Sequence, residues 1–302
     1  MQTQRQWYTS GFVGLMLLGN SLLLSPTVGM ALPAVQVAQA VQTAESAINQ
    51  GIQYIQQGKV SDAIDAFRRA TQLDPRMSAA HYNLGLALRQ QGQLQPAATA
   101  FYQATQADPT FALAYANLGA ALLEGNNLPQ AKDYLQRAVE LNPKLGLAHY
   151  NLGLVLERQG SFDPAVNAYQ KAIELSPTAP EPAYHLGMVY TQQRKTKEAR
   201  AAFEQAIKID PSYAEAHYNL GSLLFAQGDL DGALNTFRRS AQANSNYANA
   251  YYAAGLVFIR QNKFSDAQKV LTYAKDLYAK QGNSAWATKA EQQLQKAKTA
   301  QR

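Results

Sequence analysis

The five residues His149-Tyr150-Asn151-Leu152-Gly153 decide the fold of this chain. The same five residues return as His81-Tyr82-Asn83-Leu84-Gly85 and as His217-Tyr218-Asn219-Leu220-Gly221. Weaker copies fill the gaps, so that a glycine recurs every 34 residues: Gly51, Gly85, Gly119, Gly153, Gly187, Gly221 and Gly255. Self-similarity at a fixed period is the sequence signature of a repeat protein.

Other columns keep the same spacing. An alanine lies 12 residues after each glycine, a Phe, Tyr or Leu four residues later, and an alanine or serine three beyond that. A proline closes five repeats: Pro75, Pro109, Pro143, Pro177 and Pro211. This pattern resembles the tetratricopeptide repeat (TPR) family, whose unit is a pair of antiparallel helices. The resemblance implies an all-α, right-handed superhelical solenoid of seven 34-residue helix-turn-helix repeats across residues 44–281.

Helical periodicity supports the same fold. In the repeat 146–179, two apolar stripes at helical spacing lie on either side of Gly160, where a turn with positive φ is expected. One repeat cannot bury its stripe alone, so the repeats must stack. Their expected bounds are 44–77, 78–111, 112–145, 146–179, 180–213, 214–247 and 248–281.

Small residues, aromatic residues and prolines have separate expected roles. Gly153 and Ala165 allow two helix backbones to approach closely, and Tyr169 is expected to fill the wedge between neighbouring repeats. Asn126, Arg194 and Asn262 replace glycine at the turn position. Each proline ends a second helix because the residue before proline is pushed out of the α region.

Residues 282–302 are predicted to form a capping helix and a basic tail. Trp286, Ala290, Leu294 and Ala297 form one more apolar stripe. From 263 to 302 there are eight basic and three acidic residues, which gives +5 of the chain's net charge of +6. A basic tail can bind nucleic acid or anionic membrane, but no aromatic residues interleave with these lysines as a stacking platform requires. The charge therefore indicates a solvated face, and no nucleic-acid partner is expected.

The first 43 residues do not belong to the repeats. Residues 11–24 are apolar apart from Asn20 and Ser21, after a single charge at Arg5, which is typical of a secretory signal peptide. We expect a signal peptide at 1–31, with cleavage as late as residue 40, and a linker at 32–43. The expected location is the periplasm or the extracellular space. The alternative is an uncleaved anchor, although the run is shorter than the ~20 residues that span a bilayer. Membrane contact is expected only through this segment or the basic tail.

One column of residues is the candidate binding site. The TPR resemblance implies that first helices line a concave groove. There the chain places an amide column and a tyrosine column, whose candidate peptide-binding members are Asn49, Asn83, Asn117, Asn151, His185, Asn219, Tyr82, Tyr150, Tyr184, Tyr218 and Tyr252. The asparagines are similar to the ladder that grips a peptide backbone in O-linked N-acetylglucosamine transferases. A carboxamide both donates and accepts, so it pairs with a peptide unit of any sequence. The alternative is that the asparagines pack adjacent repeats together.

Catalysis finds no support in the sequence. No nucleophile elbow, phosphate loop or metalloprotease motif occurs, and the absence of cysteine excludes disulfides and cysteine-ligated metal. His81, His149 and His217 occupy equivalent positions and are predicted to be packing residues. We therefore expect no enzyme, cofactor or metal site.

The function predicted is that of an exported scaffold that binds an extended peptide or a partner protein in its groove. The lysines and arginines that clamp a chaperone's carboxylate tail in some TPR proteins are missing from the matching positions, which argues against that partner class. The second hypothesis is a structural or assembly component of an envelope or pilus complex, with its convex surface or ends as the interface.

Overall fold

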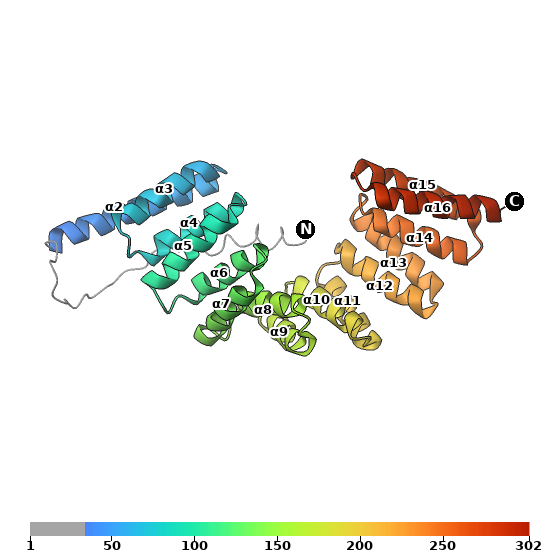
Figure 1. The fold of residues 1–302 in the computed structure, drawn as a ribbon, viewed down its shortest axis with the longest axis horizontal. Coiled ribbons are helices and arrows are strands. Elements are labelled where there is room, and N and C mark those ends of the chain that lie inside the picture. Colours follow the sequence, from blue (N-terminus) through green and yellow to red (C-terminus); the bar gives the residue numbers. More distant parts are fainter. Residues whose placement is uncertain (1–33, 302) are drawn as a thin grey trace. The chain divides into compact units, whose positions relative to one another are not determined.

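The structure, a computed structural model, describes residues 34–301, which form fifteen α-helices without a β-strand (Figure 1). The signal peptide expected at 1–31 lies outside these residues. No helix of the described segment is both long enough and apolar enough to cross a membrane. The described residues divide into two compact units, which meet between Gly160 and Ser161 in the sequence: unit 1 up to Gly160 and unit 2 from Ser161.

Unit 1 consists of consecutive helices that pack against their sequence neighbours. Its helices are α2 (Ala34–Gln56), α3 (Val60–Leu73), α4 (Ser78–Gln90), α5 (Leu94–Ala107), α6 (Ala112–Glu124), α7 (Leu128–Leu141) and α8 (Gly146–Arg158). The pairs α2–α3, α4–α5 and α6–α7 correspond to the first three expected repeats. Helix α2 begins at Ala34, so most of the expected linker 32–43 continues the first helix of the first repeat.

Unit 2 has the same organisation and ends in a single helix. Its helices are α9 (Phe162–Leu175), α10 (Glu181–Gln192), α11 (Thr196–Ile209), α12 (Ala214–Gln227), α13 (Leu230–Ala243), α14 (Ala248–Arg260), α15 (Phe264–Lys280) and α16 (Ser284–Ala300). Helix α16 buries Ala290, Leu294 and Ala297 and packs on α15. The predicted capping helix is therefore present.

The turns between paired helices depend on the left-handed conformation. Gly58, Gly92 and Gly228 have φ between 75° and 85°, and Gly160 has φ of 73°. The residues that replace glycine keep that conformation: Asn126 (φ 61°), Arg194 (φ 59°) and Asn262 (φ 55°). Arg194 is the costly case, because an L-residue without a short polar side chain is strained there.

The second helices end through side chains as well as through proline. In five repeats an Asp or Asn carboxyl or amide oxygen accepts a hydrogen bond from the backbone N–H two residues later: Asp74, Asp108, Asn142, Asp210 and Asn244. Asn244 is followed by Ser245, and its helix still ends at Ala243. Proline is therefore not required, because the Asx turn closes the end of the helix by itself.

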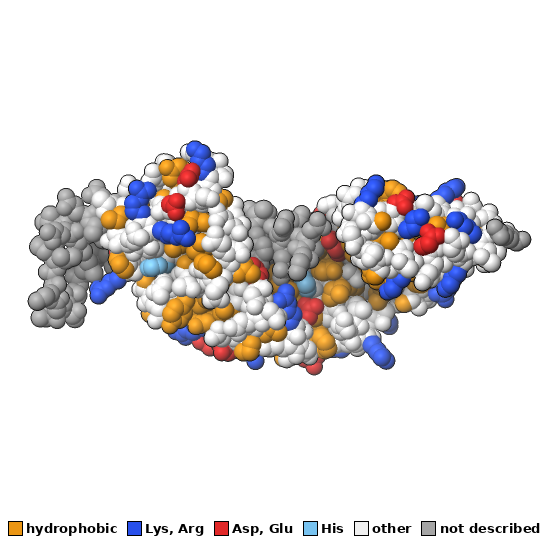
Figure 2. Space-filling view, turned by 45° about the horizontal axis from the view of Figure 1, so that its top comes forward, with side chains coloured by type: hydrophobic (Ala, Val, Ile, Leu, Met, Phe, Trp, Pro, Cys, Tyr) orange, Lys and Arg blue, Asp and Glu red, His pale blue; other side chains and the backbone are white. Residues whose placement is uncertain are grey.

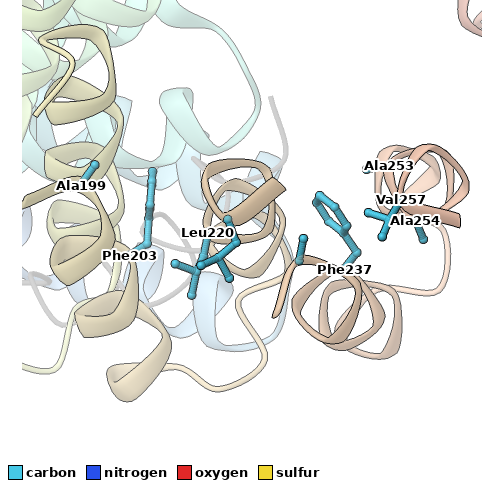
Figure 3. Close-up of a cluster of buried hydrophobic side chains, with 9 residues drawn as sticks. Ala199, Phe203, Leu220, Phe237, Ala253, Ala254 and Val257 are labelled. Carbon is cyan, nitrogen blue, oxygen red and sulfur yellow. The ribbon is translucent and has the colours of Figure 1, made fainter. Parts of the chain in front are cut away.

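The helix glycines lie directly beneath large side chains of the same repeat. A Cβ atom on Gly85 would come within 2.6 Å of the Phe101 ring, and one on Gly221 within 2.7 Å of Phe237. The large side chain thus packs on the glycine of the same repeat, a contact that the sequence analysis does not predict. Its far side contacts the next repeat, as Figure 3 shows for a cluster of Phe203, Leu220 and Phe237 in unit 2.

We predict that Gly221→Leu destabilises unit 2. The added side chain must displace Phe237, and overpacking of this kind typically costs about 1–3 kcal/mol. Chemical denaturation followed by circular dichroism measures the change. Ala226→Leu is the matched control, because Ala226 is exposed on the same helix. Equal stability of the two variants would contradict the packing role of the glycine.

We also predict that Arg194→Gly stabilises the chain. The left-handed conformation costs an ordinary L-residue about 1–2 kcal/mol, whereas glycine gives back about 0.5–1 kcal/mol in unfolded-state entropy. The expected gain is therefore about 0.5–1 kcal/mol. Gly92→Ala should lower the free energy of unfolding by a similar amount. A Cβ atom on Gly92 meets nothing within 4 Å, so the substitution adds backbone strain without a steric clash. Thermal melts of both variants test the pair, and a destabilised Arg194→Gly chain would refute the explanation.

Candidate protein-interaction site

Two asparagines of the predicted ladder hold tyrosine hydroxyls of the preceding repeat. In unit 1, Asn117 Nδ2 donates to the Tyr82 hydroxyl at 3.3 Å and to the Leu113 carbonyl at 3.0 Å. In unit 2, Asn219 Nδ2 makes the equivalent bonds to Tyr184 and to the Glu215 carbonyl, at 3.2 Å and 2.9 Å. Each tyrosine–asparagine pair is separated by 35 residues. These bonds tie successive first helices together.

The amides differ in how much hydrogen-bonding capacity they retain. Asn117 Oδ1 also accepts from Arg89 at 3.0 Å, so both ends of that amide are engaged. Asn219 is half-buried, and its Oδ1 receives no hydrogen bond from the described residues. The Asn219 side-chain oxygen can therefore accept a hydrogen bond from a ligand. The Asn117 oxygen can do so only if it releases Arg89.

Asparagines without a tyrosine 35 residues earlier lack this bond. The residue 35 positions before Asn83 is Ile48, which has no hydroxyl. The Asn83 side chain is 0% exposed, and neither of its amide atoms has a hydrogen-bond partner among the described residues. Full burial keeps Asn83 from contacting a ligand without a change in packing. Asn151, which has Ala116 at the position 35 residues earlier, is also buried, whereas Asn49 in the first repeat is exposed.

The remaining candidate residues separate into buried and half-buried groups. Tyr82 and Tyr150 are buried in unit 1, and burial raises the pKa of Tyr82 to about 12. Tyr184, Tyr218 and Tyr252 are half-buried in unit 2. His185 stands in the amide column but packs between aromatic rings: its centroid is 5.7 Å from that of Tyr169 and 5.2 Å from that of Tyr184.

A second column of contacts, not found from the sequence, runs along the same helices. Arg89 forms an ion pair with Glu124, whose carboxylate is 2.5 Å from the guanidinium, and both side chains are largely buried. At the repeat position of Glu124, one residue further along than Arg89, Arg158 donates to the Leu123 carbonyl at 2.9 Å and Arg260 to the Phe225 carbonyl at 3.4 Å. The ion pair between Arg89 and Glu124 could have been predicted from the sequence, because the two residues carry opposite charges and lie 35 positions apart.

The candidate site in unit 2 is a set of half-buried side chains on α10, α12 and α14. We call it the first-helix face and define it by Tyr184, Met188, Tyr218, Phe225, Tyr252 and Ile259. Tyr184, Tyr218 and Tyr252 recur at repeat spacing, as do Phe225 and Ile259, so their side chains form rows across successive helices. Within one repeat they are four or seven residues apart, which keeps them on one side of the helix. The face is mainly aromatic and aliphatic, and tyrosine hydroxyls add polar groups.

Three histidines of the described residues occupy equivalent positions in their repeats. His81, His149 and His217 each place Nε2 2.9 Å from the carbonyl oxygen of the proline six residues earlier, as packing residues do. No group of three His, Asp or Glu residues in the described segment is suited to a metal ion. A cavity of about 540 Å³, lined by Ile207, His217 and Arg239, lies among α11, α12 and α13.

Stacked helix pairs with a partly exposed apolar face define a helical-repeat scaffold of the kind that generally mediates protein–protein interaction. Sequence profiles of known families identify the kind of repeat. Tetratricopeptide repeat profiles match residues 48–110 and 116–180, and TPR repeat profiles match 187–228 and 221–262. The chain belongs to the tetratricopeptide repeat family.

Several solved structures resemble the chain. MamA is 29% identical with a TM-score of 0.50, over 55% of this chain and 96% of that one. YrrB, described as a TPR protein with an unusual peptide-binding site, is 26% identical with a TM-score of 0.51, over 64% and 99%. PilF of Pseudomonas aeruginosa, at 20% identity and a TM-score of 0.61 over 70% and 96%, shares the fold. No curated protein matched the chain.

We predict that Tyr184→Phe destabilises unit 2 while Tyr218→Phe does not. The first substitution removes the hydroxyl that accepts from Asn219, and a net hydrogen bond contributes about 0.5–1.5 kcal/mol. The residue 35 positions after Tyr218 is Ala253, which has no side-chain amide, so Tyr218→Phe removes no equivalent hydrogen bond. Urea denaturation of both variants gives the comparison. Equal losses would show that the tyrosine–asparagine bond does not stabilise the stack.

Proposed function

We propose that this chain is an exported protein-interaction scaffold that binds an extended peptide segment of a partner along the first-helix face. The observation that carries the proposal is the row of half-buried aromatic side chains Tyr184, Tyr218 and Tyr252 in unit 2. Such rings offer a large contact area and lose little rotamer entropy on binding. The repeat spacing suits an extended ligand, which can contact several repeats in turn.

The polar groups of the first-helix face support a backbone contact. Asn219 keeps a free amide oxygen that can accept from a peptide N–H. The tyrosine hydroxyls next to it add further hydrogen-bonding capacity. In this proposal the ladder binds mainly through Asn219 and the unit 2 tyrosines, while Asn117 and Asn83 stabilise or fill the helix stack. The similarity to YrrB, a TPR protein that has a peptide-binding site, agrees with a peptide ligand.

A second candidate function is assembly through the outer surface. The second helices expose large apolar side chains, namely Leu73 on α3, Tyr102 on α5 and Tyr273 on α15, each at least 40% exposed. Figure 2 shows hydrophobic side chains dispersed among polar ones on this view of the surface. Such residues favour a component that packs into a larger complex through its second helices.

Export rests on the uncharged apolar run 11–24. In this proposal a signal peptidase removes the first 31 to 40 residues, and the mature chain works outside the cytoplasm. Intact-mass analysis of the protein from its native source tests the proposal. A chain that retains Met1 in the cytoplasmic fraction would refute it.

The binding test uses peptides selected from a random displayed library on the purified full chain. We predict that the double variant Tyr218→Ala/Phe225→Ala weakens binding of selected peptides at least about tenfold, as for central aromatic contacts. Thermal melts confirm that the variant is folded. The control is Tyr102→Ala/Tyr273→Ala, which should bind normally. The opposite result would favour the outer-surface function.

A further inference from the structure

Two cations lie over aromatic rings around the first-helix face. The Arg260 guanidinium carbon is 5.3 Å from the centroid of the Phe225 ring. On the capping helix, Lys289 Nζ is 4.1 Å from the centroid of Trp286. Neither cation forms an ion pair with another described residue. The two charges are therefore held in position without being neutralised.

The capping helix extends the aromatic row. Trp286 is 37% exposed, and its ring meets Tyr252 edge-on at 5.6 Å between centroids. The Trp286 ring also stacks on Tyr278, with 5.8 Å between the two ring centroids. The indole thus joins the tyrosine row to Lys289, so a ligand that follows the row towards α16 reaches a fixed positive charge.

Carboxylates close to these cations are few. The first helices of unit 2 contain two acidic residues, Glu181 and Glu215, both in a first turn, and α14 contains none. On α16, the carboxylate of Glu291 is 3.2 Å from Lys275, and hydrogen bonds from Gln295 and then from Lys275 lower the pKa of Glu291. Unit 1 differs, because Glu124 neutralises its Arg89 internally. Among the described residues, those of α12, α14 and α16 combine half-buried or exposed rings with cations that form no ion pair.

We propose that the first-helix face of unit 2 selects an acidic, apolar peptide, whose aromatic or aliphatic side chains contact Tyr218, Tyr252 and Phe225 while its carboxylates bind Arg260 and Lys289. This inference rests on the proposed function, since it names the chemistry of the peptide bound there. Arg260 uses one N–H on a carbonyl and keeps the rest of its five donors. The cation–π contacts hold both side chains in place, which lowers the ordering cost of each new charge contact.

The composition of the selected peptides is the first test. Peptides selected from the random library on the intact chain should be enriched in Asp and Glu together with Phe, Leu, Ile or Tyr, relative to the starting library. Enrichment of apolar residues with no excess of acidic ones would overturn this inference and leave the proposed function standing. Failure to enrich any peptide would overturn both.

The second test removes the charges and keeps the aromatic face. Arg260→Gln/Lys289→Gln should weaken binding of an acidic selected peptide by about 3- to 30-fold, the range of two partly exposed charge contacts. It should leave binding of the matched peptide, with Asn and Gln in place of Asp and Glu, unchanged. Added salt should weaken binding to the native chain more than to the variant.

The control variant carries the same loss of charge elsewhere in unit 2. Lys208→Gln/Lys269→Gln removes two exposed cations from the second helices α11 and α15 and should bind the acidic peptide normally. Equal weakening in both double variants would mean that net charge alone drives binding. Tighter binding of native chain to phosphatidylserine vesicles or to a single-stranded oligonucleotide than to the acidic peptide would also overturn the inference.

Discussion

The contact on which the rest of the structure depends is that of a large second-helix side chain against a first-helix glycine of the same repeat. The Phe237 ring occupies the space that a side chain on Gly221 would need. This contact sets how closely the two helices of a pair approach. It also leaves the far side of the ring free to meet the next first helix, so one side chain serves packing within a repeat and between repeats.

Close approach of the first helices brings residues 35 positions apart into hydrogen-bonding distance. The bond from Asn117 to Tyr82, and that from Asn219 to Tyr184, follow directly. Where the earlier residue is Ile48, the asparagine is buried without a partner. An unsatisfied buried amide costs free energy, so repeats with the same consensus contribute differently to the stability of the stack.

The two units differ in how many side chains of the first helices are accessible to a ligand. In unit 1, Tyr82 and Tyr150 are buried, and Arg89 is held by Glu124. In unit 2 the equivalent tyrosines are half-buried and Arg260 stacks on Phe225 with most of its donors free. A scaffold with one saturated stretch and one open stretch places its binding capacity towards the C-terminal repeats.

The helical repeat fold, the turn positions and the capping helix could be predicted from the sequence, because the 34-residue period and the local backbone preferences can be read without knowing any tertiary contact. Even the left-handed turns at Asn126, Arg194 and Asn262 could be located from the period. Tertiary structure alone decided which ladder residues are available. Whether Asn219 retains an acceptor, or Asn117 is saturated by Tyr82 and Arg89, depends on side chains one repeat away. The consensus makes these asparagines identical in sequence, but hydrogen bonding across the stack makes them chemically different.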